Sequence, residues 1–159
     1  MRQRAYNDHM GRRVVYTPQM IFDGKAHMVG SKRKRVMHKV ESLKAEQDSK
    51  TNVTITKGEN GQLQAHLDAK DIGEKAVVRL VWYDDARTVD IGRGENRGRE
   101  LTYHNVVRGS QVIGHYDGKA ASFDLPIEDA KMMDCDALVV LVQQDPVGPI
   151  IGAAQTRLN

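Results

Sequence analysis

Apolar residues recur at helical spacing after Ser31 and predict a helix that runs to about Gln47. Ser31 is in the right place to be the N-cap of this helix. The recurring apolar positions are Val36, Val40 and Leu43. Residues 1–10 are typical of the end of another helix, because Gly11 is well placed to terminate it. The pattern therefore predicts two helices within the first fifty residues.

Between these helices the chain is β-prone. Short strands are expected at residues 14–16 and 19–22, interrupted by Thr17-Pro18. The Asp23-Gly24 pair is a strong signal for a hairpin turn, and residues 26–29 form the returning strand. The first fifty residues thus predict the order helix, strand, strand, helix.

From Thr51 onward the hydrophobic period changes to two. Val53 and Ile55 alternate with threonines, and Glu59-Asn60-Gly61 marks a turn before the alternating residues 63–67. Seven or more short strands separated by turn signals favour an antiparallel β-sandwich. The fold class expected is α+β, with a helix-strand-strand-helix part at residues 1–50 and a β-rich part at 51–159. The further strands are expected at residues 76–83, 88–91, 101–107, 112–116, 120–125, 136–143 and 150–156.

The size and charge of the chain narrow the classes of function. A chain of 159 residues suits one compact domain, or one domain and a partial one. Its apolar runs are too short for a bilayer helix, so no membrane span is expected. The net charge of +3 is uneven, because residues 1–50 hold 12 Lys/Arg and 5 Asp/Glu, whereas residues 51–159 hold 12 and 16. This asymmetry fits either a nucleic-acid or anionic-surface contact or an attraction between the two parts of the fold.

The cysteine content restricts redox chemistry. Cys135 is the single cysteine, so the chain has no internal disulfide or Cys-x-x-Cys dithiol. Its neighbours Asp134 and Asp136 disfavour the thiolate, the nucleophilic form. We therefore interpret Cys135 as a structural residue.

Other motifs that carry chemistry are sparse. The six histidines lack metal-ligand spacing, and no hydrolase elbow is present, so no metal, cofactor or catalytic residue is predicted. The glycine-rich stretch 92–98 lacks the Gly-x-Gly-x-x-Gly spacing and is expected to connect two strands. Its arginines, Arg93 and Arg97, together with Arg99, are candidate anion contacts.

A basic run, Lys32-Arg33-Lys34-Arg35, resembles a nucleic-acid or nuclear-localisation patch. The alternative is the solvated polar face of a helix. Because no aromatic residues are interleaved with these cations to stack on bases, we regard nucleic acid as an unlikely partner.

Several segments carry a resemblance to a known family. Residues 16–24, with Thr17-Pro18 followed by a strand and a tight hairpin, resemble the back half of a thioredoxin fold. Arg2-Gln3-Arg4-Ala5-Tyr6 and segments within 95–108, 141–143 and 148–154 extend the match. Together they resemble the secreted thioredoxin-like family catalogued as domain of unknown function 1223, over essentially the whole chain.

The resemblance implies a cis bond at Thr17-Pro18, with Thr17 and Pro18 contacting an extended peptide by strand addition. It implies a periplasmic or secreted location, although the chain carries no signal peptide of its own. It also implies a preceding half with a Cys-x-x-Cys motif that this chain lacks, so Met1 is interpreted as a truncated or downstream start. We accordingly expect residues 1–50 to self-associate, to pair with a complementary fragment or to be loosely ordered.

Two functional hypotheses follow. In the first, the chain is the C-terminal portion of a thioredoxin-like protein without thiol-disulfide activity of its own, and the β-rich part is an accessory or interaction module. In the second, it is a small binding protein that contacts nucleic acid or an anionic surface through residues 32–35.

Overall fold

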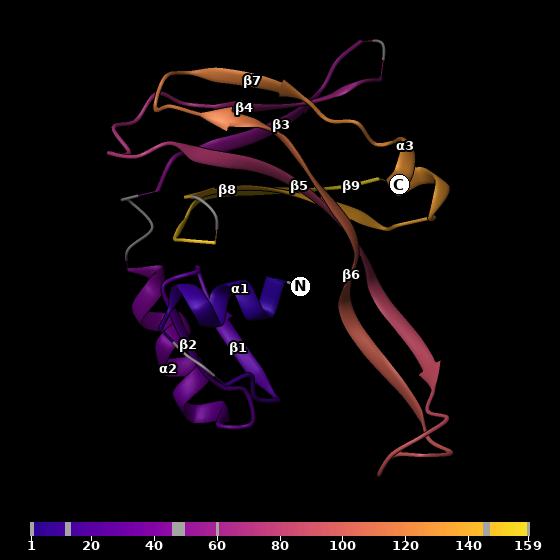
Figure 1. Ribbon diagram of the computed structural model, residues 1–159. Coiled ribbons are helices and arrows are strands. Elements are labelled where there is room, and N and C mark those ends of the chain that lie inside the picture. The colour runs from indigo at the N-terminus through magenta and orange to yellow at the C-terminus, as the bar shows by residue number, and fades with distance from the viewer. Residues whose placement is uncertain (1, 12–13, 46–49, 60, 145–146, 159) are drawn as a thin grey trace.

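The computed structural model describes residues 2–11, 14–45, 50–59, 61–144 and 147–158. It combines α-helices with three antiparallel sheets of two, three and four strands (Figure 1). A helical segment, residues 2–45, lies beneath a two-sheet region, residues 50–158. The helical segment contains α1 (Arg2–His9), β1 (Gln19–Phe22), β2 (Ala26–Val29) and α2 (Arg33–Lys44).

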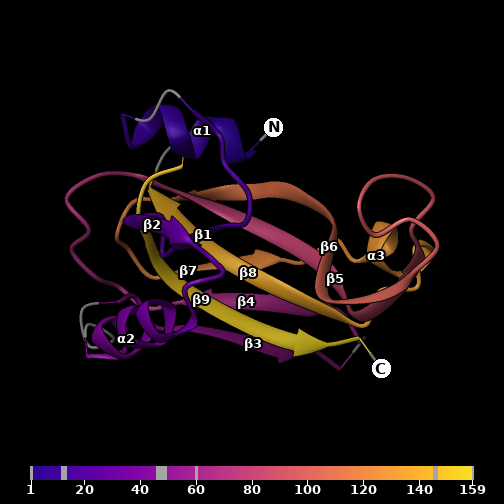
Figure 2. The same cartoon turned by 90° about the horizontal axis from the view of Figure 1, so that it is seen from below.

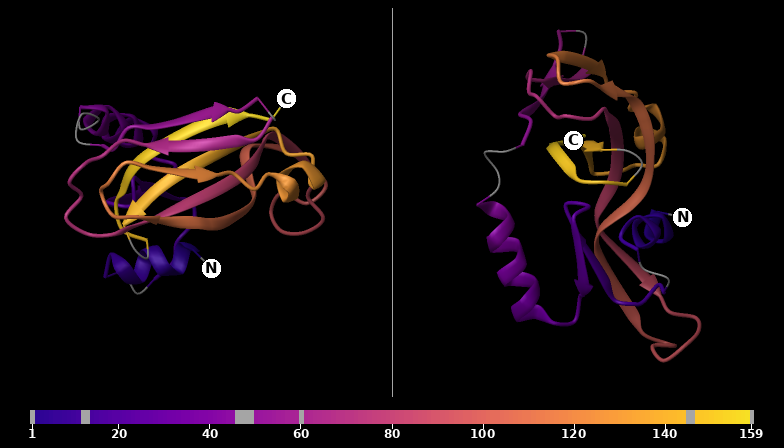
Figure 3. Two further views of the ribbon diagram at one scale, coloured as in Figure 1. Left: turned by 90° about the horizontal axis from the view of Figure 1, so that it is seen from above. Right: turned by 60° about the vertical axis from the view of Figure 1, so that its left-hand side comes forward.

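The two-sheet region contains a three-stranded sheet in the order β3-β4-β7 and a four-stranded sheet in the order β6-β5-β8-β9. Figure 3 (left) shows the first sheet lying over the second. One apolar core unites them, because alternate residues of one long strand, Ala76, Val78, Leu80 and Trp82, are buried against the three-stranded sheet. The elements are β3 (Val53–Lys57), β4 (Leu63–Leu67), β5 (Ala76–Asp90), β6 (Glu100–Tyr116), β7 (Ala121–Asp124), α3 (Glu128–Met132), β8 (Ala137–Gln144) and β9 (Ile150–Arg157).

β5 and β6 continue past the two-sheet region as a long hairpin, the arm, residues 84–107 (Figure 1). The prediction of separate strands at 76–83 and 88–91, and at 101–107 and 112–116, is therefore wrong. The pairing of β5 with β6 instead continues through both expected breaks, with register shifts between Val78 and Arg79 and between Trp82 and Tyr83. Most residues of the arm are exposed on both faces, so the arm lacks the alternation that marks a half-buried strand.

The helical segment agrees with the predicted order of elements and differs in detail. Residues 14–16 form no strand, and Ser31 is not the N-cap, since α2 begins after Lys32 and has no side-chain cap. The hairpin loop holds three residues, because Lys25 follows Asp23-Gly24 before the chain pairs again. Gln47 and Asn60, placed by the pattern in a helix and a turn, lie outside the described residues. The expected apolar face of α2 is present: Val36 and Leu43 are buried with Phe22.

The helical segment is fastened to the two-sheet region at the β1–β2 turn. The Ile150 amide donates to the Asp23 carbonyl over 2.7 Å, and Lys50 pairs with the Asp23 carboxylate at 2.5 Å. Gly24 packs directly against the Gly148 carbonyl, where a side chain would not fit. The helical segment and the arm both extend below the four-stranded sheet (Figure 1), and the view from below shows α1 and α2 toward one end of the sheet and the arm toward the other (Figure 2).

Candidate functional site

A groove follows the outer edge of β1, between that strand and α1. Its volume is about 560 Å³. The strand side of the groove is formed by Thr17, Pro18, Gln19 and Ile21. The helix side is formed by Arg2, Gln3 and Tyr6. Both residues singled out by the resemblance, Thr17 and Pro18, therefore lie in one depression, and both are exposed. The bond between them is cis.

The backbone of β1 along this groove has no hydrogen-bonded strand beside it among the described residues. The Gly30 amide donates to the Pro18 carbonyl over 2.8 Å. In the register of β1 and β2, the backbone groups of Pro18, Met20 and Phe22 therefore face β2. Since facing pairs alternate along such a ladder, the N–H and C=O groups of Gln19 and Ile21 point away from β2. No third strand joins this sheet within the part of the chain that the structure describes. Thr17 continues the row, and its backbone makes no hydrogen bond to another described residue.

Side-chain amides hold α1 against the start of β1. The Gln3 amide donates to the Gln19 side-chain oxygen over 2.8 Å, and Gln19 donates in turn to Asn7 over 2.8 Å. Asn7, almost fully buried, donates to the Val14 carbonyl, and Gln3 also reaches the Tyr16 carbonyl. The Gln3–Gln19 and Gln19–Asn7 bonds join α1 to β1, and the other two join α1 to the segment that precedes β1.

The helix wall is in turn tied to the four-stranded sheet. The buried Gln143 of β8 accepts from the Arg2 guanidinium over 2.8 Å and donates to the Tyr6 hydroxyl over 2.7 Å. The same amide donates to the Gly148 carbonyl, beside the turn that anchors the helical segment. Arg2 also donates to Tyr6 and lies over its ring, 5.3 Å from the centroid. The helix side of the groove is thus held in place by hydrogen bonds to β8.

The candidate anion contacts predicted from the sequence do not line this groove. Arg93, Arg97 and Arg99 occupy the exposed loop at the tip of the arm. Two backbone hydrogen bonds close this loop: the Ile91 amide donates to the Arg99 carbonyl, and the Gly98 amide donates to the Ile91 carbonyl. The basic run at 32–35 is also exposed and opens α2, in which no acidic residue occupies the first turn. The structure brings neither set to the groove.

Cys135 is buried beside an ion pair at the base of the arm. The pKa of its thiol is raised by burial first and by the nearby Asp84 carboxylate second, which keeps the thiol protonated. Burial opposes ionisation of Asp84, but Arg108, 2.8 Å away, and Arg87 outweigh it and hold the pKa of Asp84 below its usual range. Asp84 reciprocally raises the pKa of Arg108. This geometry suits a structural cysteine and gives no activated nucleophile.

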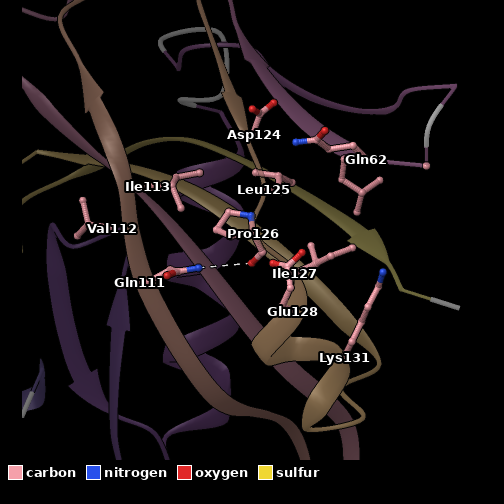
Figure 4. Close-up of a pocket in the computed structure, with 12 residues that line it drawn as sticks. Gln62, Gln111, Val112, Ile113, Asp124, Leu125, Pro126, Ile127, Glu128 and Lys131 are labelled. Carbon is pink, nitrogen blue, oxygen red and sulfur yellow. Dashed lines mark hydrogen bonds between the residues drawn. The ribbon is translucent and has the colours of Figure 1, made fainter.

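A second depression, of about 650 Å³, opens between β6, the end of β7 and α3 (Figure 4). Gln111 of β6 donates to the Pro126 carbonyl across it, over 3.4 Å. Its charged groups are spread out: Asp124 lies at one end and is held by Gln64, while Lys131 extends from α3 at the other. No group of three or more His, Cys, Asp or Glu residues among the described positions forms a metal site. The groove along β1 is the better candidate because its free backbone groups recur in a regular row.

Comparisons with known proteins show the family to which the chain belongs. The model of the family described as protein of unknown function (DUF1223) matches residues 1–143. The chain belongs to that family. No curated protein matches the chain.

One solved structure gives a measure of the fold. The chain is similar to a crystal structure of a protein from Agrobacterium tumefaciens, determined by a structural genomics consortium, with a TM-score of 0.82 and 24% identity. The match covers 99% of this chain and 69% of that chain. The two proteins share a fold over nearly all of this chain. No described helix is both long and apolar enough to cross a bilayer.

Proposed function

We propose that the chain is a protein-interaction module that accepts an extended polypeptide segment along the outer edge of β1. The observation that carries this proposal is the row of free backbone groups at Thr17, Gln19 and Ile21, all of which line one groove. An edge strand with unpaired N–H and C=O groups is a template for another strand. Main-chain hydrogen bonds then supply affinity, and the groove walls select side chains.

The proposal includes a thioredoxin-like interpretation of the helical segment. In such a fold the residue before the cis proline offers its backbone to an extended peptide, which is the role proposed for Thr17. The two-sheet region is then a sandwich-like accessory module that positions the groove through Gln143 and the β1–β2 turn. The chain itself performs no thiol-disulfide exchange in this proposal, since Cys135 is buried and its thiol is protonated.

The hypothesis of a nucleic-acid or anionic-surface contact through residues 32–35 has less support. Those residues lie at the exposed start of α2 and line neither of the two depressions described above. A salt-dependent mobility shift with a DNA duplex, lost when Lys32, Arg33, Lys34 and Arg35 are replaced by glutamine, would favour it.

Strand addition is tested with a short, capped peptide of alternating valine and threonine. Fluorescence anisotropy is recorded with the unmodified peptide and with two analogues, each N-methylated on alternate amides. Because only one set of amides faces β1, one analogue is expected to lose binding by about tenfold or more and the other to keep it. Equal binding of both analogues would contradict main-chain pairing.

A matched pair of proline variants tests the edge itself. Ile21→Pro removes an outward N–H from β1, and Val29→Pro removes an outward N–H from the opposite edge of the same hairpin. Proline is tolerated at edge positions whose N–H faces solvent, so both hairpins should form. We expect Ile21→Pro to abolish peptide binding and Val29→Pro to retain it; circular dichroism and thermal unfolding check that both variants fold.

A further inference from the structure

Arg79 occupies an unusual position in the middle of β5. The flanking residues Val78 and Leu80 are fully buried in the apolar core, so Arg79 projects from the opposite face of the four-stranded sheet. Figure 1 shows α1 lying beneath that face. Arg79 is paired with Leu141 in the register of β5 and β8, and Gln143 is its diagonal neighbour on the same face. Gln143 is the residue that binds Arg2, so the register brings the two arginines to one place.

Neither guanidinium has an acidic partner in the described part of the chain. Among the described residues, no carboxylate lies within ion-pair distance of Arg2 or Arg79. The Nε of Arg79 is buried and makes no hydrogen bond there. The arginines at the base of the arm behave differently, since Arg87 and Arg108 both contact Asp84. None of the described carboxylates therefore compensates the positive charge under α1.

The local electrostatics agree with this geometry. Burial first, and the positive charge of Arg2 second, lower the pKa of Arg79, whereas Tyr6 acts in the opposite direction. Two like charges that are partly removed from water repel each other and attract an anion. Arg79 is only half-buried, so an anion can reach it from solvent. Each guanidinium carries five N–H donors, and Arg2 uses few of them in its bonds to Tyr6 and Gln143.

We infer that Arg79 and Arg2 form an oxyanion site at the α1 end of the groove, and that its ligand is a carboxylate of the segment bound along β1. Arg2 belongs to both features, because it lines the groove and contacts Gln143 beside Arg79. The inference rests on the proposed function for the source of the carboxylate and deepens it: the preferred segment is extended and carries an acidic side chain. Paired arginines are well suited to this ligand, since their planar donors match a carboxylate or a phosphate.

The site itself is tested with inorganic phosphate alone. Thermal unfolding of the full chain is followed in phosphate and in chloride at equal ionic strength, for the unmodified protein and for Arg79→Met. Phosphate should raise the Tm of the unmodified protein more than that of Arg79→Met, and titration calorimetry should show at least a tenfold weaker dissociation constant for the variant. In chloride, Arg79→Met should be as stable as the unmodified protein or more stable, because the change removes an unpaired charge.

Arg97→Met, an exposed arginine at the tip of the arm, is the matched control and should respond to phosphate like the unmodified protein. An equal phosphate effect in Arg79→Met would overturn the inference. A marked loss of stability of Arg79→Met in chloride would overturn it too, since it would show that Arg79 is already satisfied within the fold.

The peptide source of the anion is tested separately. The valine-threonine peptide is prepared with one glutamate and with glutamine at the same position. Tighter binding of the glutamate peptide, by about tenfold and only when Arg79 is present, supports the inference. A phosphate effect that depends on Arg79 without binding of either peptide supports an oxyanion site and contradicts the proposed function. Binding of both peptides with equal affinity supports strand addition and contradicts a carboxylate site.

Discussion

The two-sheet region and the helical segment are stabilised by different means. Sixteen buried residues form one apolar core between the two sheets, whereas three buried residues, Phe22, Val36 and Leu43, form the core of the helical segment among the residues described. The helical segment compensates with polar contacts to its neighbour, through Gln143 and through Asp23. The comparison teaches that the two-sheet region is stabilised mainly by its own apolar core, whereas the part that carries the candidate site depends on attachment to that region.

The largest loss of stability is expected from a substitution in the apolar core of the two-sheet region. Leu80 is fully buried, and Leu80→Ala should lower the free energy of unfolding by about 3–5 kcal/mol through lost burial and a residual cavity. Leu43→Ala, in the smaller core, should cost about 2–3 kcal/mol because its surroundings can collapse more readily. Urea unfolding measures both values. A larger loss for Leu43→Ala would reverse the comparison.

The next effect concerns the junction between the two-sheet region and the arm. Asp84→Ala leaves Arg108 without its carboxylate and should lower the free energy of unfolding at neutral pH by more than the loss of an exposed pair does. The matched control is Asp85→Ala, which removes a more exposed pair with Arg157 and should cost at most about 1 kcal/mol. Chemical unfolding at pH 7 compares the two variants.

The pH dependence of Asp84 has a defined sign. Its pKa in the folded state lies below the usual value, so its ionised form stabilises the fold above the unfolded pKa of about 4. That stabilisation is lost as the pH falls through the folded pKa. The difference in stability between the unmodified protein and Asp84→Ala should therefore be constant near neutrality and shrink below about pH 4; a gap that grew on acidification would contradict the assignment.

A smaller effect tests the attachment of the helical segment. Gly24 has a φ of +69° and abuts Gly148, whereas Gly11 has a φ of +67° and open space where a Cβ would lie. Gly11→Ala should cost about 1 kcal/mol from backbone conformation alone. Gly24→Ala adds a clash with the two-sheet region and should cost about 1–2 kcal/mol more. Similar losses in the two variants would mean that the contact with Gly148 is unimportant.

Sequence patterns predicted most of the elements because burial on one face produces a readable period. Residues 53–67 alternate clearly, and the strands found there match the prediction. The arm was missed because its residues face water on both sides, so acidic and glycine positions looked like strand ends. The short helix α3 has too few turns to establish a helical period.

The candidate site was only partly readable from the sequence. The resemblance indicated Thr17 and Pro18, but it gave no sign that Arg2 and Gln3 face them, because this proximity depends on how α1 packs. Arg79 did leave a signal, a lone arginine within the apolar strand at 76–83. Its proximity to Arg2 depends on the register of β5 with β8, which local sequence does not determine.

Amide hydrogen exchange, resolved by residue along β1, tests the central claim most directly. In the free protein the Gln19 and Ile21 amides should exchange quickly, and the Met20 and Phe22 amides, which face β2, should be protected. Addition of the valine-threonine peptide should slow exchange at Gln19 and Ile21 and leave the other two unchanged. Protection of Gln19 and Ile21 already in the free protein, or no change on adding the peptide, would contradict an open edge that accepts a strand.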